Sequence, residues 1–269
     1  MAIDPVLAEY PFLPAARDAV EEIGLTPETV ATDRPLAMAR AVGRVERALT
    51  AGSVAPARDV DPVGVEVELL SYPIARILVS LLGFPPAVDK YARAEAMTAM
   101  QRLSARVEGN DPLADPVGQR VLSAVGLAEA IEPHGGGRTG GHRRSYWLDL
   151  DKFLTHVDPQ WGGSWRLVTR EVTAGAVLVE TAELLRLTGA AIEATVGADL
   201  PFPLAGTPVE AALTAEVDTI GEQLDAHAPP HAVEASVVVP ALFPPCMRAA
   251  IQQIRDGDQL SRPGEFAVT

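Results

Sequence analysis

Apolar side chains recur at helical spacing along the first half of the chain. Residues three or four apart share one face of a helix, so a stripe of this period predicts a helix packed against a core. One stripe follows Asp33-Arg34-Pro35, ends at Gly52, and consists of Leu36, Ala39, Val42, Val45 and Leu49. A second stripe follows Ser71-Tyr72-Pro73, ends at Gly83, and consists of Ile74, Ile77, Leu78, Leu81 and Leu82. Proline at the start and glycine after the end mark the expected boundaries of both helices.

Two more helices are predicted before residue 134. Residues 88–107 are rich in alanine and contain neither proline nor glycine, which favours a helix. Asp115-Pro116 opens the other helix, whose apolar side is expected to carry Val117, Val121, Val125 and Ala128.

Residues 134–144 interrupt this pattern with five glycines in eleven residues. Such a composition predicts a flexible loop and a boundary between subdomains. The loop also carries Arg138, Arg143 and Arg144, and three arginines together could contact the phosphates of a nucleic acid. A plain exposed loop explains them as well. Because the glycines precede a strand pattern instead of a helix, we do not expect a phosphate cradle at this loop.

The apolar period changes to alternation after the loop. Residues 146–150 predict a strand, followed by a helix that Asp151 could cap. Residues 165–168 predict the start of a second strand. Ala174-Gly175 predicts a turn, and 176–179 a third strand, after which a helix begins.

The last third of the chain again predicts helices. Thr207 can cap one, Pro208 takes its first position, and Glu210 can reach back as a capping box. Its apolar stripe consists of Leu213, Val217, Ile220 and Leu224. A short β-branched run at 236–239 and a last helix after Phe243-Pro244-Pro245 complete the chain. Together these elements predict an α+β fold that is predominantly α-helical, with a small β/α subdomain inserted into a helical domain.

Charge adds information about the solvent. The chain has 36 acidic and 22 basic residues and a formal net charge of −14, and Lys90 and Lys152 are its only lysines. A strongly acidic surface with almost no lysine is typical of proteins that work in concentrated salt, where self-repulsion is screened within about 3 Å at 1 M. An ordinary acidic protein from a GC-rich genome is the alternative interpretation.

Candidate chemistry is sparse. The sequence has no Gly-x-x-x-x-Gly-Lys phosphate loop, no Gly-x-Gly-x-x-Gly joining a strand to a helix, no His-Glu-x-x-His and no Gly-x-Ser-x-Gly. Cys246 is the only cysteine, which excludes an internal disulfide. The N-terminus has no secretory pattern and no apolar run reaches about 18 residues, so we expect a cytoplasmic protein that makes no membrane contact.

Residues Leu242–Arg248, with the sequence Leu-Phe-Pro-Pro-Cys-Met-Arg, resemble the large subunit of archaeal and eukaryotic DNA primase. In that family a Pro-Pro-Cys turn begins the iron–sulfur domain, and a glycine, a Leu-Ser pair and an aromatic-rich helix come after it. Here Gly257, Leu260-Ser261 and Phe266–Val268 match those features. Other stretches agree with the family in the same order, namely Tyr72–Leu78, Tyr146–Leu150 with Phe153-Leu154, and Trp165–Arg170 with Gly175–Leu178.

This resemblance implies a regulatory, non-catalytic subunit that docks and modulates a catalytic small subunit in a heterodimer during RNA primer synthesis for DNA replication. Template DNA and primer would be contacted through the complex. Cys246 is implied to be the first of four ligands to a 4Fe–4S cluster, whose other three ligands are absent from this chain. The chain therefore resembles a large subunit truncated early in its iron–sulfur domain, and we expect it not to assemble the cluster alone. The acidic, lysine-poor composition suggests a haloarchaeal member.

The expected domains derive from the pattern and the resemblance together. They are a helical part at 1–133, the glycine-rich loop at 134–144, a small β/α subdomain at 145–204, a helix and linker at 205–240, and an incomplete, helical start of the iron–sulfur domain at 241–269.

Two alternatives compete with the primase interpretation. One is an unrelated acidic helical interaction protein. The other is an enzyme that uses Cys246 as a nucleophile, since a thiolate at a helix N-terminus can be activated.

Overall fold

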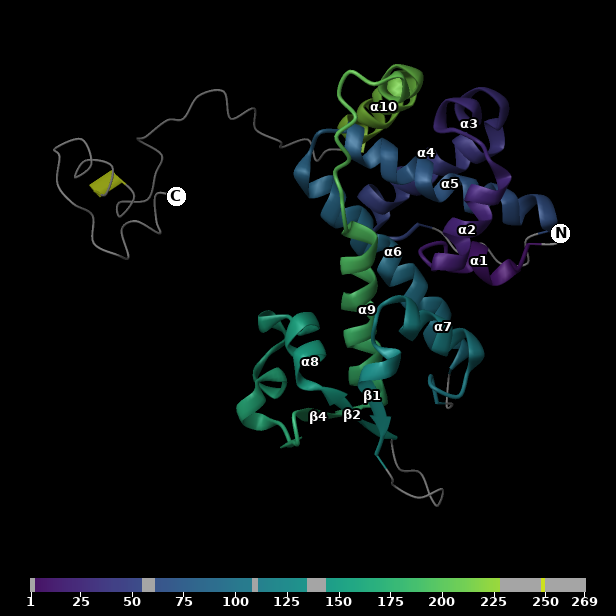
Figure 1. The fold of residues 1–269 in the computed structure, drawn as a ribbon. Coiled ribbons are helices and arrows are strands. Elements are labelled where there is room, and N and C mark those ends of the chain that lie inside the picture. The colour runs from purple at the N-terminus through teal and green to yellow at the C-terminus, as the bar shows by residue number, and fades with distance from the viewer. Residues whose placement is uncertain (1–2, 55–60, 108–110, 135–143, 228–247, 250–269) are drawn as a thin grey trace. The chain divides into compact units, whose positions relative to one another are not determined.

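The computed structural model (Figure 1) describes residues 3–54, 61–107, 111–134, 144–227 and 248–249. By its internal contacts the chain divides into two units, Met1–His227 and Ala228–Thr269. The helices and strands labelled in Figure 1 belong to the first unit.

Each helix of the first half begins with a proline, which has no backbone N–H. The loss costs nothing there, because the N–H groups of the first helical turn have no partner within the helix. Aspartate or threonine caps several of these helices, and the side chain of Asp61, for example, accepts a hydrogen bond from the Gly64 N–H at 2.7 Å. The helices are α1 (Pro5–Glu9), α2 (Pro14–Ile23), α3 (Pro27–Asp33), α4 (Pro35–Ala51), α5 (Pro62–Leu81), α6 (Pro85–Arg106) and α7 (Pro116–Ala124).

A small antiparallel sheet with the strand order β1-β2-β4-β3 follows α7. Its strands are β1 (Ile131–Pro133), β2 (Ser145–Asp149), β3 (Val172–Thr173) and β4 (Ala176–Glu180). Helix α8 (Leu150–His156) and short 3₁₀ turns connect β2 to β3, and α9 (Thr181–Gly197) and α10 (Pro208–His227) complete the unit.

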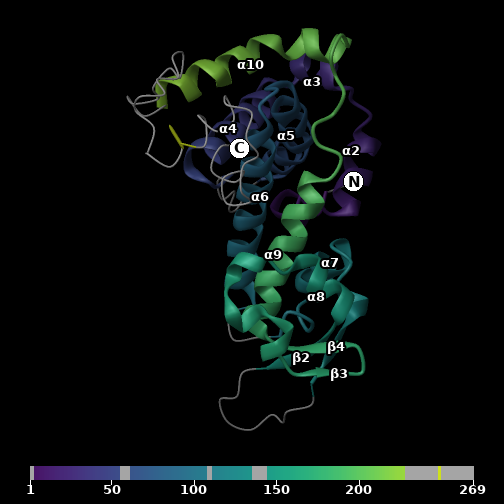
Figure 2. The same ribbon diagram turned by 90° about the vertical axis from the view of Figure 1, so that its left-hand side faces the viewer.

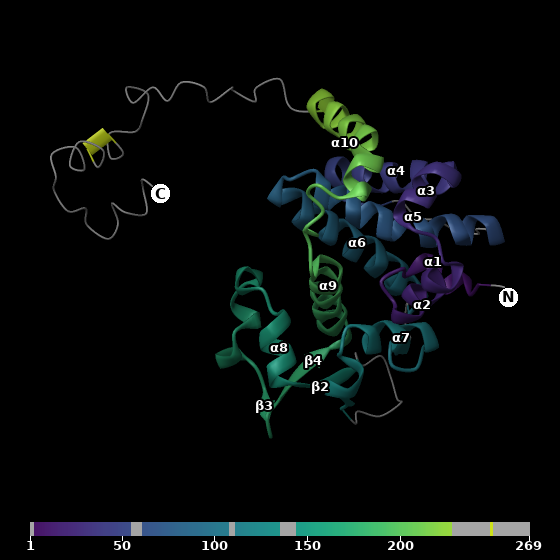
Figure 3. The same cartoon turned by 45° about the horizontal axis from the view of Figure 1, so that its top comes forward.

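Two hydrophobic cores lie within this unit. The larger one joins α1–α7 to α10 and to the C-terminal part of α9, where Ile192 and Val196 are buried. The smaller one lies on the inner face of the sheet, where Tyr146 and Val179 pack with Phe153 of α8 and Leu184 of α9. Helix α9 therefore connects the sheet to the helical part, as Figures 2 and 3 show.

The predominantly helical α+β fold class is confirmed. Helix α4 has the predicted bounds, and the predicted apolar stripe is confirmed in part: Val42, Val45 and Leu49 pack in the core. Leu36, which is 65% exposed, and Ala39, which is exposed as well, do not. The buried face consists of Ala37, Met38, Ala41, Arg44, Val45 and Ala48. Small side chains let α5 approach closely, and Arg44, which the apolar pattern leaves outside the core, is buried with its ion-pair partners.

The predicted start of the second helix is also wrong. Helix α5 begins at Pro62, and Pro73 lies inside it. An internal proline removes one hydrogen bond and usually breaks a helix. Here α5 is buried along most of its length, from Val65 to Ser80, so packing holds the helix through the proline.

The strand predicted at 165–168 is wrong too. Trp165 is buried, but Val168 is 91% exposed, and two 3₁₀ turns occupy this stretch. Asp151 lies in the first turn of α8 and is not its cap, since the helix begins at Leu150. The predicted strand at 146–150 is confirmed as β2, apart from its last residue, and the strand at 176–179 as β4.

Two predictions from local signals are confirmed. The turn at Ala174-Gly175 has positive φ angles of 51° and 83°, as a tight hairpin requires. Thr207 caps α10 by accepting from the Glu210 N–H at 3.3 Å, while the Glu210 carboxylate accepts from the N–H of Gly206, one residue before the cap. The predictions for 135–143, for 228–247 and for 250–269 lie outside the described residues, and the domain boundaries stay predictions.

Candidate functional site

An arginine of α4 is fully buried among carboxylates of α5 and α6. The Arg44 Nε donates to Glu95 Oε1 at 2.6 Å, and its Nη1 donates to Glu68 Oε2 at 3.1 Å. The side chains of Arg44, Glu68 and Glu95 are 0%, 7% and 4% exposed. Arg40 adds a second cation through its Nε, which donates to Glu68 Oε1 at 2.6 Å. Two positive and two negative charges therefore balance inside the core and connect three helices.

The charges around Arg44 keep it protonated. Burial lowers the pKa of its guanidinium, but the negative charges of Glu95 and Glu68 outweigh that effect and raise the pKa above its usual value. The guanidinium of Arg44 is thus a fixed cation at the centre of this ion cluster.

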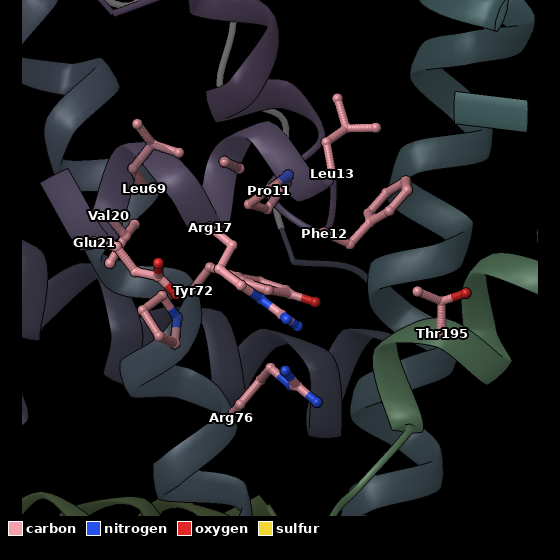
Figure 4. Close-up of a pocket in the computed structure, with 12 residues that line it drawn as sticks. Pro11, Phe12, Leu13, Arg17, Val20, Glu21, Leu69, Tyr72, Arg76 and Thr195 are labelled. Atoms are coloured by element: carbon pink, nitrogen blue, oxygen red, sulfur yellow. The ribbon is translucent and has the colours of Figure 1, made fainter. Parts of the chain in front are cut away.

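A pocket of about 450 Å³ opens beside this network, over the stretch of α5 that resembles the primase family (Figure 4). Its floor comes from Tyr72, Pro73 and Arg76 of α5, and the Tyr72 ring centroid lies 5.6 Å from the Arg44 guanidinium. Its walls come from the turn between α1 and α2, from α2 and from α9, and include Phe12, Arg17, Glu21 and Thr195. The pocket therefore collects residues that are far apart in the sequence.

Two arginines give this pocket its polar character. Arg76 is held in place because its Nη2 donates to the Ala198 carbonyl at 2.7 Å and its guanidinium lies 5.2 Å from the Phe202 ring centroid. Burial and the charge of Glu95 raise the pKa of Tyr72, so its hydroxyl stays protonated and can donate. Arg17 is exposed at the opposite wall.

The outer face of the sheet carries a second cluster of candidate residues. Trp147 of β2 lies directly between Glu132 of β1 and Leu178 of β4 in the sheet register. Trp147 and Leu178 are half-buried, and the His134 ring meets the indole edge-on at 5.4 Å between centroids. Helices α8 and α9 contact the sheet and supply its buried inner side, so the outer side presents Trp147 between an acidic and an apolar neighbour.

A wide groove of about 970 Å³ also runs along α6 and α9. At one end the Arg186 guanidinium lies 4.2 Å from the Trp161 ring centroid, and Trp161 meets Trp165 edge-on at 4.6 Å. Its charged lining residues include both signs, among them Arg93 and Glu193, whose side chains pair at 3.4 Å. The lining of the groove therefore mixes acidic side chains with arginines.

The sequence-predicted site residues are only partly described. Cys246, Arg138 and Arg143 lie outside the described residues. Arg144 is described, and its Nη1 pairs with Asp111 Oδ2 at 2.7 Å. No three His, Cys, Asp or Glu side chains gather as a metal site in the described ranges. The predicted roles of all four residues therefore stay predictions.

Sequence reasoning does not predict the pocket beside α5. The motif Tyr72–Leu78 stands out only by its family resemblance, and no sequence pattern connects it with Arg17 of α2 or Thr195 of α9. A proline next to a tyrosine inside a long apolar helix is the one available signal.

None of the helices that the structure describes is both long and apolar enough to cross a lipid bilayer.

Comparison with known proteins gives consistent matches along the whole chain. No protein-family model matches it. The chain is 36% identical over 273 residues to the DNA primase large subunit PriL of Haloarcula marismortui, a match that covers 99% of this chain and 72% of that protein. The protein of the same name from Halobacterium salinarum is 36% identical over 97% of this chain and 71% of its own length. The one from Methanococcoides burtonii is 32% identical, with coverages of 98% and 70%.

Proposed function

Because this chain belongs to the DNA primase large subunit family of archaea, we propose that it is the regulatory, non-catalytic subunit of a primase and docks on a catalytic small subunit. The complex would make RNA primers for DNA replication in the cytoplasm of a halophilic archaeon. The observation that carries the proposal is the identity of 36% to haloarchaeal relatives over 99% and 97% of the chain. These matches favour the primase interpretation over an unrelated acidic interaction protein.

The small subunit is proposed to dock on the outer face of the sheet. Aromatic residues dominate the binding energy of many protein interfaces, above all where the partner removes them fully from water. Trp147 is half-buried and is flanked across the sheet by Glu132 and Leu178. The inner face of the same strands is filled by the smaller core, so the backbone that presents Trp147 is rigid.

Co-purification with an archaeal primase small subunit in molar KCl tests this proposal. Trp147→Ala is expected to weaken the complex roughly 30-fold, because truncating an interface aromatic costs about 2 kcal/mol or more. Leu36→Ala is the control, since Leu36 is 65% exposed on α4 and far from the sheet in sequence. Failure of both folded proteins to form a complex at micromolar concentration contradicts the partner. Equal affinities of the two variants contradict the docking surface.

An iron–sulfur cluster does not fit residues 1–269 alone. The sequence contains one cysteine, and a 4Fe–4S cluster takes four protein ligands. Cys246 is proposed as one ligand, with the others supplied from outside this sequence. The iron and sulfide content of the native protein, purified without oxygen from its own organism, should fall when Cys246 is replaced by serine. Native protein without iron would refute the assignment.

The arginines of the glycine-rich loop are proposed to contact template or primer phosphates within the complex. Each phosphate contact makes the affinity for nucleic acid fall more steeply as the salt concentration rises. Replacing Arg138 and Arg143 by alanine should lower the affinity of the complex for single-stranded DNA and flatten its salt dependence. Arg144 is a weaker contributor because Asp111 already pairs with it. An unchanged salt slope in the double variant rules out phosphate contacts by the loop.

A further inference from the structure

The pocket beside α5 concentrates hydrogen-bond donors on a chain whose net charge is −14. Figure 4 shows the guanidinium groups of Arg17 and Arg76 and the hydroxyl of Tyr72 directed toward one open space. Among the described residues, none forms an ion pair with Arg17, so its charge is available to a ligand. Guanidinium groups in this arrangement suit phosphate or carboxylate oxygens, to which they give charge-assisted hydrogen bonds.

Arg76 is fixed at the edge of the pocket. Its Nε is shielded from solvent and has no hydrogen-bond partner among the described residues. A donor that water cannot touch is equally out of reach of an oxyanion in the pocket, so the Nε does not itself contact a ligand. The contacts of Arg76 with Ala198 and Phe202 hold the guanidinium still while this donor stays unpaired. An oxyanion in the pocket is met by the remaining Nη–H groups of this fixed guanidinium.

The size and the walls of the pocket define the rest of the ligand. About 450 Å³ is within the range of small-molecule sites and too small for a folded domain. Pro11, Leu13, Val20 and Leu69 make the walls largely apolar, and the half-buried Phe12 offers a ring face. A ligand with one charged end and a flat apolar body matches this lining.

Glu21 limits the charge that the pocket accepts. It is exposed at the wall next to Val20, and together with Arg17 and Arg76 it leaves one net positive charge. A single phosphate carries a charge of about −1.5 to −2 at neutral pH, which is closer to this balance than a polyphosphate. The carboxylate can also accept a hydrogen bond from a hydroxyl of the ligand body.

We propose that this pocket binds a phosphate monoester with a flat ring system, the chemical class of a nucleoside monophosphate. The phosphate lies between Arg17 and Arg76 and accepts from the Tyr72 hydroxyl, and the ring lies on Phe12. This site goes beyond the proposed function, because it depends only on residues of the turn between α1 and α2, of α2, of α5 and of α9, and not on the docking of a partner.

Calorimetric titration of the isolated chain in molar KCl with AMP tests the proposal, with adenosine and inorganic phosphate as partial probes. AMP should bind at least tenfold more tightly than either part, because the site holds both ends. Arg17→Glu should weaken AMP binding by roughly tenfold or more, since it replaces a charge-assisted donor by a like charge. Tyr72→Phe removes only the hydroxyl and should weaken binding several-fold without unfolding the chain.

Arg47→Glu on α4 is the matched control, because Arg47 is exposed and does not line the pocket. It makes the same charge change and should leave the affinity for AMP unaltered. Equal loss in the Arg17 and Arg47 variants would mean a general charge effect and overturn the site. So would the absence of AMP binding at millimolar concentration by folded protein. Binding of an aspartate-rich peptide in place of AMP would reassign the pocket to a protein partner and also overturn the proposal.

Discussion

Replacing Arg44 by methionine removes the cation at the centre of the buried network while keeping an unbranched side chain of similar length. Glu95 then loses the Nε contact of 2.6 Å, and Glu68 loses the Nη1 contact of 3.1 Å. Glu68 keeps Arg40 as a partner at 2.6 Å. Glu95 is 4% exposed, and its buried salt bridge is the one with Arg44. The substitution therefore leaves a buried carboxylate without that cation.

The expected cost is large because the remaining charge cannot reach water. Breaking a buried ion pair by removing one partner lowers the free energy of unfolding by about 3–5 kcal/mol. A domain of this size loses about 2–4 °C of melting temperature per kcal/mol, so the melting temperature should fall by roughly 10 °C. Salt screens buried pairs much less than exposed ones, and the loss should therefore persist in molar KCl.

Thermal unfolding followed by circular dichroism in molar KCl measures the effect, with Arg47→Met as the control on the same helix. Arg47 is exposed, so its replacement should change the stability by no more than about 0.5 kcal/mol. Replacing Glu95 by leucine together with Arg44→Met should recover much of the loss, because an apolar pair of similar volume leaves no unpaired charge. If Arg44→Met melts as high as the control, the network does not hold these helices together.

Three further outcomes are expected. Gly118→Ala in α7 places a methyl group 2.3 Å from the Pro112 carbonyl oxygen and should destabilise by about 1–3 kcal/mol in chemical unfolding, whereas Gly43→Ala in α4, which meets nothing within 4 Å, should stabilise by up to about 1 kcal/mol. Burial raises the pKa of Glu183, but hydrogen bonds from Arg170 and the Glu180 N–H outweigh it and lower the pKa below 4.5. Its stabilising effect is therefore present above that ordinary value and lost as the pH falls through the folded pKa, and Glu183→Gln should flatten the acid-side decline of the melting temperature. Lowering KCl from about 1 M to 0.1 M extends the screening length from about 3 Å to 10 Å and should lower the melting temperature, and an unchanged value contradicts the halophilic interpretation.

The parts of the fold that the sequence predicts well depend on local signals. Pro35 and Gly52 bracket α4, and Thr207-Pro208 starts α10 where a cap and an N-terminal proline coincide. The turn at Ala174-Gly175 needs two residues with positive φ, which the sequence signals through its glycine. Each of these features is decided within a few residues, so neighbouring sequence is sufficient to identify it.

The errors occur where distant contacts decide the structure. Pro73 is a helix-breaking signal, yet packing along the whole of α5 overrides it. Val168 fits a strand pattern, but only Trp165 of that stretch is buried, beside Phe153 at 6.2 Å between ring centroids. The apolar pattern leaves the charged Arg44 out of the predicted core. It is buried nevertheless, because Glu68 of α5 and Glu95 of α6 neutralise its charge there.

The candidate sites show the same division. Family resemblance directs attention to the stretches around Tyr72 and Trp147, both of which face a pocket or an open sheet surface. The residues that complete each surface come from other elements, such as Arg17 from α2 and Leu178 from β4. Only the fold brings them together, so a single sequence identifies part of each surface and not its chemistry.

The position of the ion pairs agrees with a protein adapted to concentrated salt. Exposed pairs such as Arg93–Glu193, at 3.4 Å and with side chains 71% and 36% exposed, contribute little in water and less in molar salt. The Arg44 pairs are removed from solvent, so their attraction survives there. Directional charge contacts that fix α4 against α5 and α6 are thus placed where ions do not reach. The many surface carboxylates are then left to interact with the solvent, which is why the same chain can carry a net charge of −14 and still depend on arginine–glutamate pairs for its packing.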